Sequence, residues 1–179
     1  PNTEDLRNFH NQKKLDNLLS SINNEKRSMN SSMPIAVKVS PDINDYNINQ
    51  ISEVLLSNNV ECVIISNTSD ATRDSLNDIQ KHQKGGLSGK PIEVKSNLLI
   101  NKFYKNLKNK IKIIGVGGVD SGFSAYNKFL AGADYIQLYT GMVYKGPNIV
   151  NIIKNDLRKI LTQEGVKNFT EIVGNKSKL

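Results

Sequence analysis

The sequence predicts an α/β fold in which parallel strands alternate with helices. Short runs rich in β-branched and apolar residues are typical of buried parallel strands, and segments with helical spacing of apolar residues separate them. Alternation of this kind predicts a parallel sheet with the helices packed outside it. The expected strands span residues 34–39, 61–66, 111–116 and 135–139.

Each intervening helix has its own start signal or apolar face. Capping residues around Asp42 and at Ser96 are expected to begin two helices, a short helix is expected over 121–131, and Pro147 favours the first turn of a fourth. A further helix is expected before the first strand. The expected apolar faces are Leu15, Leu18 and Leu19; Ile48, Ile51, Val54 and Leu55; Leu99, Phe103 and Leu107; and Ile149, Ile153, Leu157 and Ile160.

Helix ends and loops are marked by glycine and by polar runs. Gly132 and Gly165 suit the ends of the helix over 121–131 and of the last helix, because glycine readily adopts the left-handed conformation there. The polar segments 23–32 and 69–86 are expected to be loops. The second is long for a loop after a strand, which favours a functional role or disorder.

The two parallel-sheet architectures that fit this order are the C-terminal half of a (β/α)8 barrel and a small doubly wound sheet. The chain has 179 residues, enough for one domain, whereas a complete barrel takes about 250. It begins without methionine at Pro1, in what reads as a loop. This start favours a part of something larger, but periodicity alone leaves both architectures open. In the first case, residues 1–179 are the C-terminal part of a single barrel domain whose N-terminal half is absent from this chain.

Composition narrows the possible functions. The net charge of +7 comes from scattered lysines, without tryptophan or a dense basic run, so we do not expect nucleic-acid binding. A single cysteine excludes a disulfide framework, and there is no apolar run of about 18 residues, the length that would span a membrane. The two histidines have no partner at metal-ligand spacing, so no metal site is expected.

The expected carboxyl ends of the strands carry the candidate functional residues, because chemistry in such barrels takes place there. Lys38 either points into a pocket, where it could stabilise charge on a reduced flavin, or extends to solvent. The residues of 66–68 could grip a planar amide or could simply form a turn. Gly117 and Gly118 would let backbone N–H groups approach a phosphate.

A second glycine cluster, Gly85-Gly86-Leu87-Ser88-Gly89-Lys90-Pro91, lacks the spacing of a Walker loop. It is either a plain loop or backbone that packs against a flat ligand. The remaining motifs of the chain follow in a fixed order around it. They are Pro1-Asn2-Thr3, Val37-Lys38-Val39-Ser40-Pro41-Asp42, Ser66-Asn67-Thr68, Gly115-Val116-Gly117-Gly118-Val119, Ala131-Gly132-Ala133 and Gln137-Leu138-Tyr139-Thr140.

In the order and spacing of these motifs, nearly the whole chain resembles dihydroorotate dehydrogenase of the quinone-dependent class (class 2). The resemblance implies a (β/α)8 barrel that binds FMN and oxidises dihydroorotate to orotate in pyrimidine (UMP) biosynthesis, with ubiquinone as the electron acceptor. It also implies membrane association through a region absent from this chain, and a location at the mitochondrial inner membrane.

The resemblance also implies roles for individual residues. The serine base of this class would lie just before Pro1, so no catalytic residue is assigned within the chain, and the segment alone is expected to be inactive and to bind FMN poorly. The implied cofactor-binding residues are Lys38, Ser66, Ser88, Gly89, Gly117, Gly118, Tyr139 and Thr140. The implied substrate-binding residues are Asn2, Asn67 and Thr68. The implied border of the quinone tunnel is Tyr139, Val143 and Pro147.

Three alternatives stay open at this point. One is a different FMN- or phosphate-binding barrel enzyme with the same late glycine pair. Another is a soluble dihydroorotate dehydrogenase that uses fumarate or a nicotinamide cofactor. The third is a basic binding domain without enzymatic activity, which would show salt-sensitive affinity for nucleic acid.

Overall fold

The computed structural model describes residues 9–71, 73–107 and 109–175. Its sheet is parallel, and the strands lie in the order β1-β2-β3-β4, so neighbours in sequence are neighbours in space. The predicted α/β class is therefore confirmed. The strands are β1 (Ala36–Val39), β2 (Cys62–Ile65), β3 (Lys112–Gly115) and β4 (Tyr135–Ile136).

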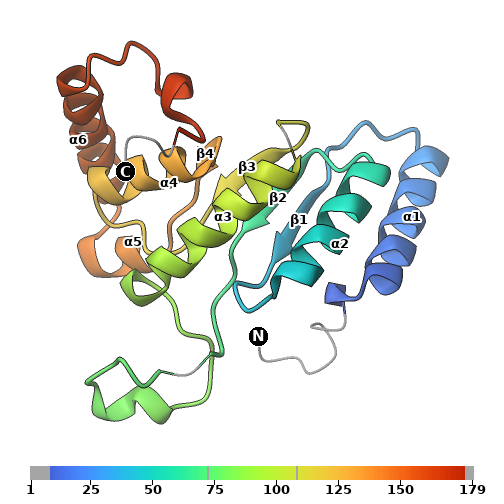
Figure 1. Cartoon of the computed structure of the whole chain (residues 1–179), viewed down its shortest axis with the longest axis horizontal. Coiled ribbons are helices and arrows are strands. Elements are labelled where there is room, and N and C mark those ends of the chain that lie inside the picture. The colour runs from blue at the N-terminus through green and yellow to red at the C-terminus, as the bar shows by residue number, and fades with distance from the viewer. Residues whose placement is uncertain (1–8, 72, 108, 176–179) are drawn as a thin grey trace.

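Helices precede, connect and follow the strands, as Figure 1 shows. Short 3-10 turns lie between some of them. The α-helices are α1 (Gln12–Ser28), α2 (Asp45–Ser57), α3 (Glu93–Leu107), α4 (Gly122–Ala131), α5 (Thr140–Lys145) and α6 (Ile149–Gln163), and the 3-10 turns are η2 (Ile79–His82), η3 (Lys90–Ile92) and η4 (Phe169–Ile172).

The main core lies between the helices and one face of the sheet. Val63 and Ile65 of β2 are fully buried in a cluster that also contains Leu55 of α2 and Phe103 of α3. Figure 1 shows α2 and α3 on the same side of the strands. Side chains of the opposite strand parity, such as Ile64, are only half-buried.

The opposite face of the sheet carries a register row that crosses all four strands. Lys38 aligns with Ile64, Ile64 with Ile114, and Ile114 with Tyr135. A doubly wound sheet would cover both faces with helices, whereas a barrel wall is covered on its outer face only. The one-sided core therefore agrees with part of a barrel and not with the doubly wound alternative.

Helix α4 has the ends that its sequence predicts. The Ser121 hydroxyl accepts a hydrogen bond from the Ser124 backbone N–H (3.2 Å), and the Ser124 hydroxyl accepts one from the N–H of Ser121 (3.0 Å). At the other end, Gly132 is left-handed with φ of +118°. This reciprocal cap and glycine stop fix the short helix that follows the glycine pair.

Two sequence predictions of helix boundaries are wrong. Residues 23–28, expected as loop, form the last turns of α1, where Asn23 donates to the carbonyl of Asn58 (2.9 Å). Such tertiary contacts override weak propensity. Helix α3 begins at Glu93 and not after a cap at Ser96, because the turn η3 runs directly into it.

The fourth strand is shorter than predicted. Strand β4 ends at Ile136, and Tyr139 precedes the short helix α5, which the sequence reading missed. The neighbouring strand β3 ends at Gly115 and turns away at the glycine pair. Residues 138–139 therefore have no ladder partner on that side, and their β-prone composition does not suffice to extend the strand.

Candidate functional site

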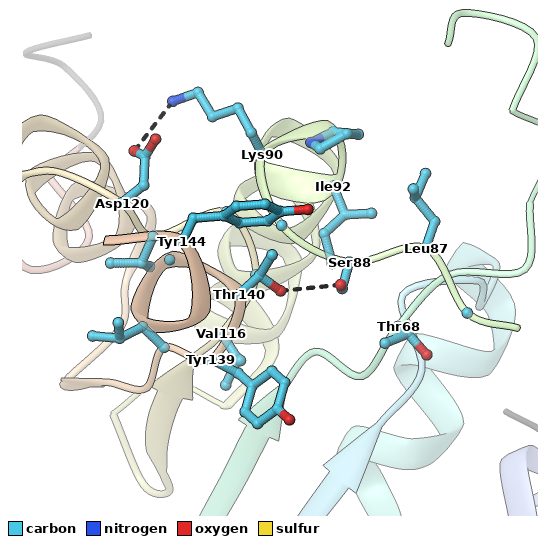
Figure 2. Close-up of a pocket in the computed structure, with 18 of the residues that line it drawn as sticks. Thr68, Leu87, Ser88, Lys90, Ile92, Val116, Asp120, Tyr139, Thr140 and Tyr144 are labelled. Carbon is cyan, nitrogen blue, oxygen red and sulfur yellow. Dashed lines mark hydrogen bonds and ion pairs between the residues drawn. The ribbon is translucent and has the colours of Figure 1, made fainter. Parts of the chain in front are cut away.

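A cavity of about 1210 Å³ opens at the carboxyl ends of the strands. Figure 2 shows residues from the loops after β2, β3 and β4 around this cavity. It brings together most of the residues singled out from the sequence. The predicted residues that line it are Lys38, Ser66, Asn67, Thr68, Ser88, Gly89, Gly117, Gly118, Tyr139 and Thr140.

Two predicted residues have a different position, and a third cannot be placed. Val143 lies exposed on α5, and Pro147 lies exposed between α5 and α6; neither lines the cavity. Asn2 lies outside the described residues. Of the proposed tunnel residues, only Tyr139 reaches the cavity, with 78% of its surface exposed.

Lys38 lies on the uncovered face of β1 and lines the cavity. Its neighbours Val37 and Val39 point toward the helix-covered core, because side chains alternate along a strand. The lysine that interrupts the apolar run is thus the one residue of 37–39 that faces the cavity. Its position agrees with the first of the two interpretations of this residue.

The segment after β2 contributes two hydroxyl groups that lack partners. Ser66 is only 2% exposed. Within the described part of the chain, neither the Ser66 Oγ nor the Thr68 Oγ1 has a hydrogen-bond partner. A turn held by side-chain bonds to the backbone would have satisfied Thr68. Unsatisfied buried hydroxyls are rare, and both of these face a cavity that a ligand could fill.

The loop after β3 needs both of its glycines. Gly117 and Gly118 have φ of +102° and +77°, in a region that side chains other than glycine rarely adopt. A Cβ on Gly118 would lie 2.8 Å from the Cα of Glu93 and closer still to its Cβ. The loop can therefore lie against the first turn of α3, which turns its backbone toward the cavity.

The glycine cluster at 85–91 contacts the first residue of α5 at the cavity wall. The Thr140 hydroxyl donates to the Ser88 hydroxyl (3.0 Å), as Figure 2 shows. A Cβ on Gly89 would lie 2.9 Å from the Cγ2 of Thr140. The cluster is thus neither a free loop nor a Walker loop, but backbone packed against the start of a helix.

Arg73 organises the long segment before this cluster, and sequence reasoning missed it. Its guanidinium donates to the carbonyls of Lys81 (3.3 Å), Gln83 (2.8 Å) and Gly85. The sequence predicts a polar loop over residues 69–86, and the described residues of this range form no element longer than the turn η2. The arginine nevertheless ties the segment into a folded arm beside the cavity. An isolated arginine in a polar run gave no signal of this.

Charged residues at the cavity mouth form a second group that the sequence reading did not identify. Lys90 pairs with Glu93 (2.5 Å) and with Asp120 (3.7 Å), the latter drawn in Figure 2. The hydrogen bond that Lys90 donates to Glu93 raises the pKa of Lys90. Lys145 donates to the carbonyl of Asp120 (2.9 Å). Asp120 thereby joins the loop after β3 to η3 and to α5.

The cavity combines hydroxyls, an amide, a lysine and backbone N–H groups. The first N–H groups of helix α5 have no partners within the helix, and Thr140 and Gly141 line the cavity. Such a set suits a planar polar ligand with an anionic end. The residues described by the structure include no group of three or more His, Cys, Asp and Glu side chains that could hold a metal ion.

A parallel sheet covered on one face, with a polar cavity at the carboxyl ends of its strands, defines the α/β-barrel class of proteins. Residues 1–161 match the family model described as dihydroorotate dehydrogenase. The dihydroorotate dehydrogenase (quinone) of Idiomarina loihiensis is 40% identical over 161 residues, which cover 88% of this chain and 48% of the relative. The chain therefore belongs to the dihydroorotate dehydrogenase family, as its motifs predicted.

A second relative, the dihydroorotate dehydrogenase (quinone) of Bartonella tribocorum, is 35% identical over 175 residues, 96% of this chain and 49% of its own length. The crystal structure of DHODH from Eimeria tenella in complex with ferulenol matches with a TM-score of 0.93 at 28% identity, over 100% of this chain and 52% of that one. These matches confirm the partial barrel. The chain spans about half the length of the curated relatives it matches.

The expected location at the mitochondrial inner membrane is wrong. The curated relatives include proteins of the bacteria Idiomarina loihiensis, Bartonella tribocorum and Vibrio atlanticus, which contain no mitochondria. The expectation came from family resemblance without any targeting segment. Among the described helices, none is both long and apolar enough to cross a bilayer.

Proposed function

We propose that this chain is the C-terminal part of an FMN-dependent dihydroorotate dehydrogenase that oxidises dihydroorotate to orotate in pyrimidine biosynthesis and passes the electrons to a quinone. The observation that carries the proposal is the gathering of Lys38, the 66–68 segment and both glycine clusters around one cavity. Family membership supplies the reaction class, and the names of the bacterial relatives supply the quinone.

The residues of the cavity fit a flavin mononucleotide. The unpartnered Ser66 hydroxyl and the Lys38 ammonium would contact the ring system, and Ser88 and Gly89 would line its edge. Backbone N–H groups of Gly117 and Gly118 would hold the phosphate, together with Tyr139 and Thr140. When bound, FMN supplies an acceptor for the hydride that leaves the substrate.

Dihydroorotate would lie next to the ring, against the loop after β2. Asn67 has a side-chain amide with donors and an acceptor, and its backbone N–H is already held by the carbonyl of Val39 (2.9 Å). Its side chain is thus left to grip the planar imide of the substrate. The free hydroxyl of Thr68 would accept or donate a further hydrogen bond. Asn2 is a third proposed contact.

The base that removes the substrate proton would come from outside this chain, immediately before Pro1. The other half of the barrel would come from the same protein and pair with both edges of the sheet, β1 and β4. Unpaired edges promote association with other strands. We expect the segment alone to bind FMN weakly, to lack activity and to aggregate.

The quinone would approach along the outer side of the cavity, beside α5. Tyr139, Met142, Val143 and Tyr144 all leave apolar surface exposed there, between 38% and 83% of each residue. An exposed cluster of this kind marks a binding site for an apolar partner. Pro147 continues this border toward α6. We propose that a hydrophobic quinone ring and tail use this surface.

The experiment that tests the function follows the visible absorbance of the intact protein anaerobically while dihydroorotate is added. A flavin band that bleaches would support the cofactor and the substrate together. A flavin band that persists would refute the substrate and leave another FMN-dependent barrel enzyme. A folded protein without a flavin band would refute the FMN site.

A comparison with the isolated segment tests the division of the barrel. Residues 1–179 alone are expected to show no bleaching, and addition of the N-terminal half should restore it. Activity of the segment by itself would contradict the proposed position of the base. Quinone reduction, measured with a soluble short-tailed quinone against fumarate and NAD⁺, then identifies the acceptor.

A further inference from the structure

A lysine is completely buried behind the cavity, where the proposed reaction makes no use of it. Lys128 lies on α4, the helix that packs between α3 and α6 (Figure 1), and its side chain is 0% exposed. Lysine is almost never fully buried without polar partners. Burying an ammonium group costs free energy. The polar contacts of Lys128 therefore indicate what the residue contributes to the structure.

The partners of Lys128 lead directly to the loop after β3. Its Nζ donates to the Oγ of Ser96 (3.1 Å) and to the Oδ1 of Asn97 (2.9 Å), both in the first turns of α3. The Ser96 hydroxyl in turn donates to the carbonyl of Val116. Val116 immediately precedes the glycine pair, and the three residues 116–118 line the cavity.

The packing around this chain of hydrogen bonds leaves little freedom. A Cβ on Gly115 would lie 3.1 Å from the Cδ of Lys128, and a Cβ on Gly117 would lie 3.4 Å from the Cβ of Ser96. The strand end and the loop thus rest on the lysine stem and on the serine. A shift of either would move the backbone of residues 116–118, which line the cavity.

We propose that Lys128 is a positioning residue for the phosphate end of the flavin site, acting through Ser96 on the Val116 carbonyl and so on the Gly117-Gly118 turn. This inference rests on the proposed FMN function. Lys128 lies outside the cavity lining and does not touch the ligand itself. Both the ammonium and the neutral amine carry enough N–H groups to donate to Ser96 and Asn97.

The protonation of Lys128 agrees with this structural role. Burial lowers its pKa to about 7, and the nearby negative charge of Glu93 opposes that shift. A surface ion pair would have kept the lysine charged and solvated. The buried lysine acts as a hydrogen-bond donor even though burial disfavours its charged form.

The test compares two flavins in the intact protein: FMN and riboflavin, which lacks the phosphate. Lys128→Met keeps an unbranched side chain, one heavy atom shorter, and removes its hydrogen bonds. We expect it to weaken FMN binding about tenfold or more, the loss of roughly one to two hydrogen bonds, while the riboflavin affinity stays within about twofold. Quenching of flavin fluorescence on binding to the apoprotein measures both affinities.

Ser96→Ala provides a second, smaller change on the same path. It should reduce FMN affinity selectively as well, and the double variant should bind no more weakly than Lys128→Met alone, because both changes break one chain of contacts. Lys154→Met, at an exposed position on α6, is the matched control and should leave both affinities unchanged.

Three outcomes would overturn the inference: unchanged FMN affinity in a folded Lys128→Met protein, equal losses for FMN and riboflavin, or no effect of Ser96→Ala. If Lys128→Met does not fold, Ser96→Ala alone decides. Failure of the proposed function is distinguishable, because then the unmodified protein itself would bind FMN no better than riboflavin.

Discussion

Gly118 shows how a single residue connects packing to the site. Its backbone is left-handed, and the first turn of α3 occupies the space where a side chain would begin. From the sequence alone, the glycine pair predicts a backbone that a phosphate can approach. The structure adds that the loop also lies close to a helix, so Gly118 is needed for packing as well.

Gly118→Ala should therefore destabilise the protein by more than the backbone strain at positive φ would cost alone. We expect a loss of about 3 kcal/mol, from strain at positive φ together with overpacking against Glu93. Gly165→Ala is the control, since it also has positive φ of +69° but no atom within 4 Å of the added Cβ. It should cost only about 1 kcal/mol. Urea unfolding of the intact protein measures both, and equal losses would contradict the packing argument.

Lys128 makes the free energy of unfolding increase as the pH rises, because folding lowers the pKa of this lysine. Its folded-state pKa is lowered to about 7, against an ordinary value of 10.5. Between these two values the unfolded chain binds more protons than the folded one, so stability rises as pH increases from about 7 to 10.5. The contribution is at most about 1.4 kcal/mol per pH unit.

The measurement is the free energy of unfolding at several pH values between 7 and 10, in the intact protein and in Lys128→Met. The variant lacks the group, so the difference between the two curves isolates this lysine from Glu93 and other titrating neighbours. A difference that does not change over this range would contradict a depressed pKa.

At the scale of elements, α4 is a short helix with a cap at each end. Its bounds and its glycine stop were readable from sequence, and the structure adds the reciprocal cap between Ser121 and Ser124. The same helix carries Lys128 and contacts β4 and α6. The position of α4 relative to the strands therefore affects the site, because the helix carries Lys128.

Ser121→Ala should remove the hydroxyl that accepts from the Ser124 N–H and cost about 1 kcal/mol. Ser28→Ala is a matched control, because Ser28 lies exposed at the end of α1 and donates only to a carbonyl of its own helix. Thermal unfolding of the two variants provides the comparison. A loss in Ser28→Ala as large as in Ser121→Ala would show that the cap is not the cause.

At the scale of the whole molecule, one face of the sheet is not covered by the described core helices. Ile64 and Ile114 share a register row, lie outside the described core cluster between helices and sheet, and would face the interior of a complete barrel. Apolar side chains on such a face gain most of their burial when the other half joins. Substitutions on this face should thus affect the isolated segment and the complete barrel differently.

Ile64→Asp tests this difference. In the isolated segment we expect a small effect, since Ile64 is already half-exposed to solvent. In the complete barrel the buried carboxylate should cost about 2 kcal/mol or more and reduce the yield of flavin-loaded protein. Ile152→Asp, on the outside of α6, is the control. Equal yields from the two complete proteins would contradict a closed barrel.

The sequence determined the parts that depend on local pattern. Strand-like runs, the apolar helical faces, the glycine stop of α4 and the order of strand-end residues all follow from neighbours a few positions apart, and the ordered motifs indicated the family. Distant contacts decide the features that the sequence did not predict: the last turns of α1, held by Asn58, the early start of α3 and the short β4.

Only the tertiary structure decided which polar residues share one site and what supports them. Arg73 and Lys128 have no sequence signal, because a lysine or arginine in isolation is usually a solvated surface residue. Their roles come from partners between 8 and 32 positions away, such as Ser96 for Lys128. Local sequence specifies backbone conformation, whereas burial and hydrogen bonding of a charged side chain depend on elements that meet only after folding.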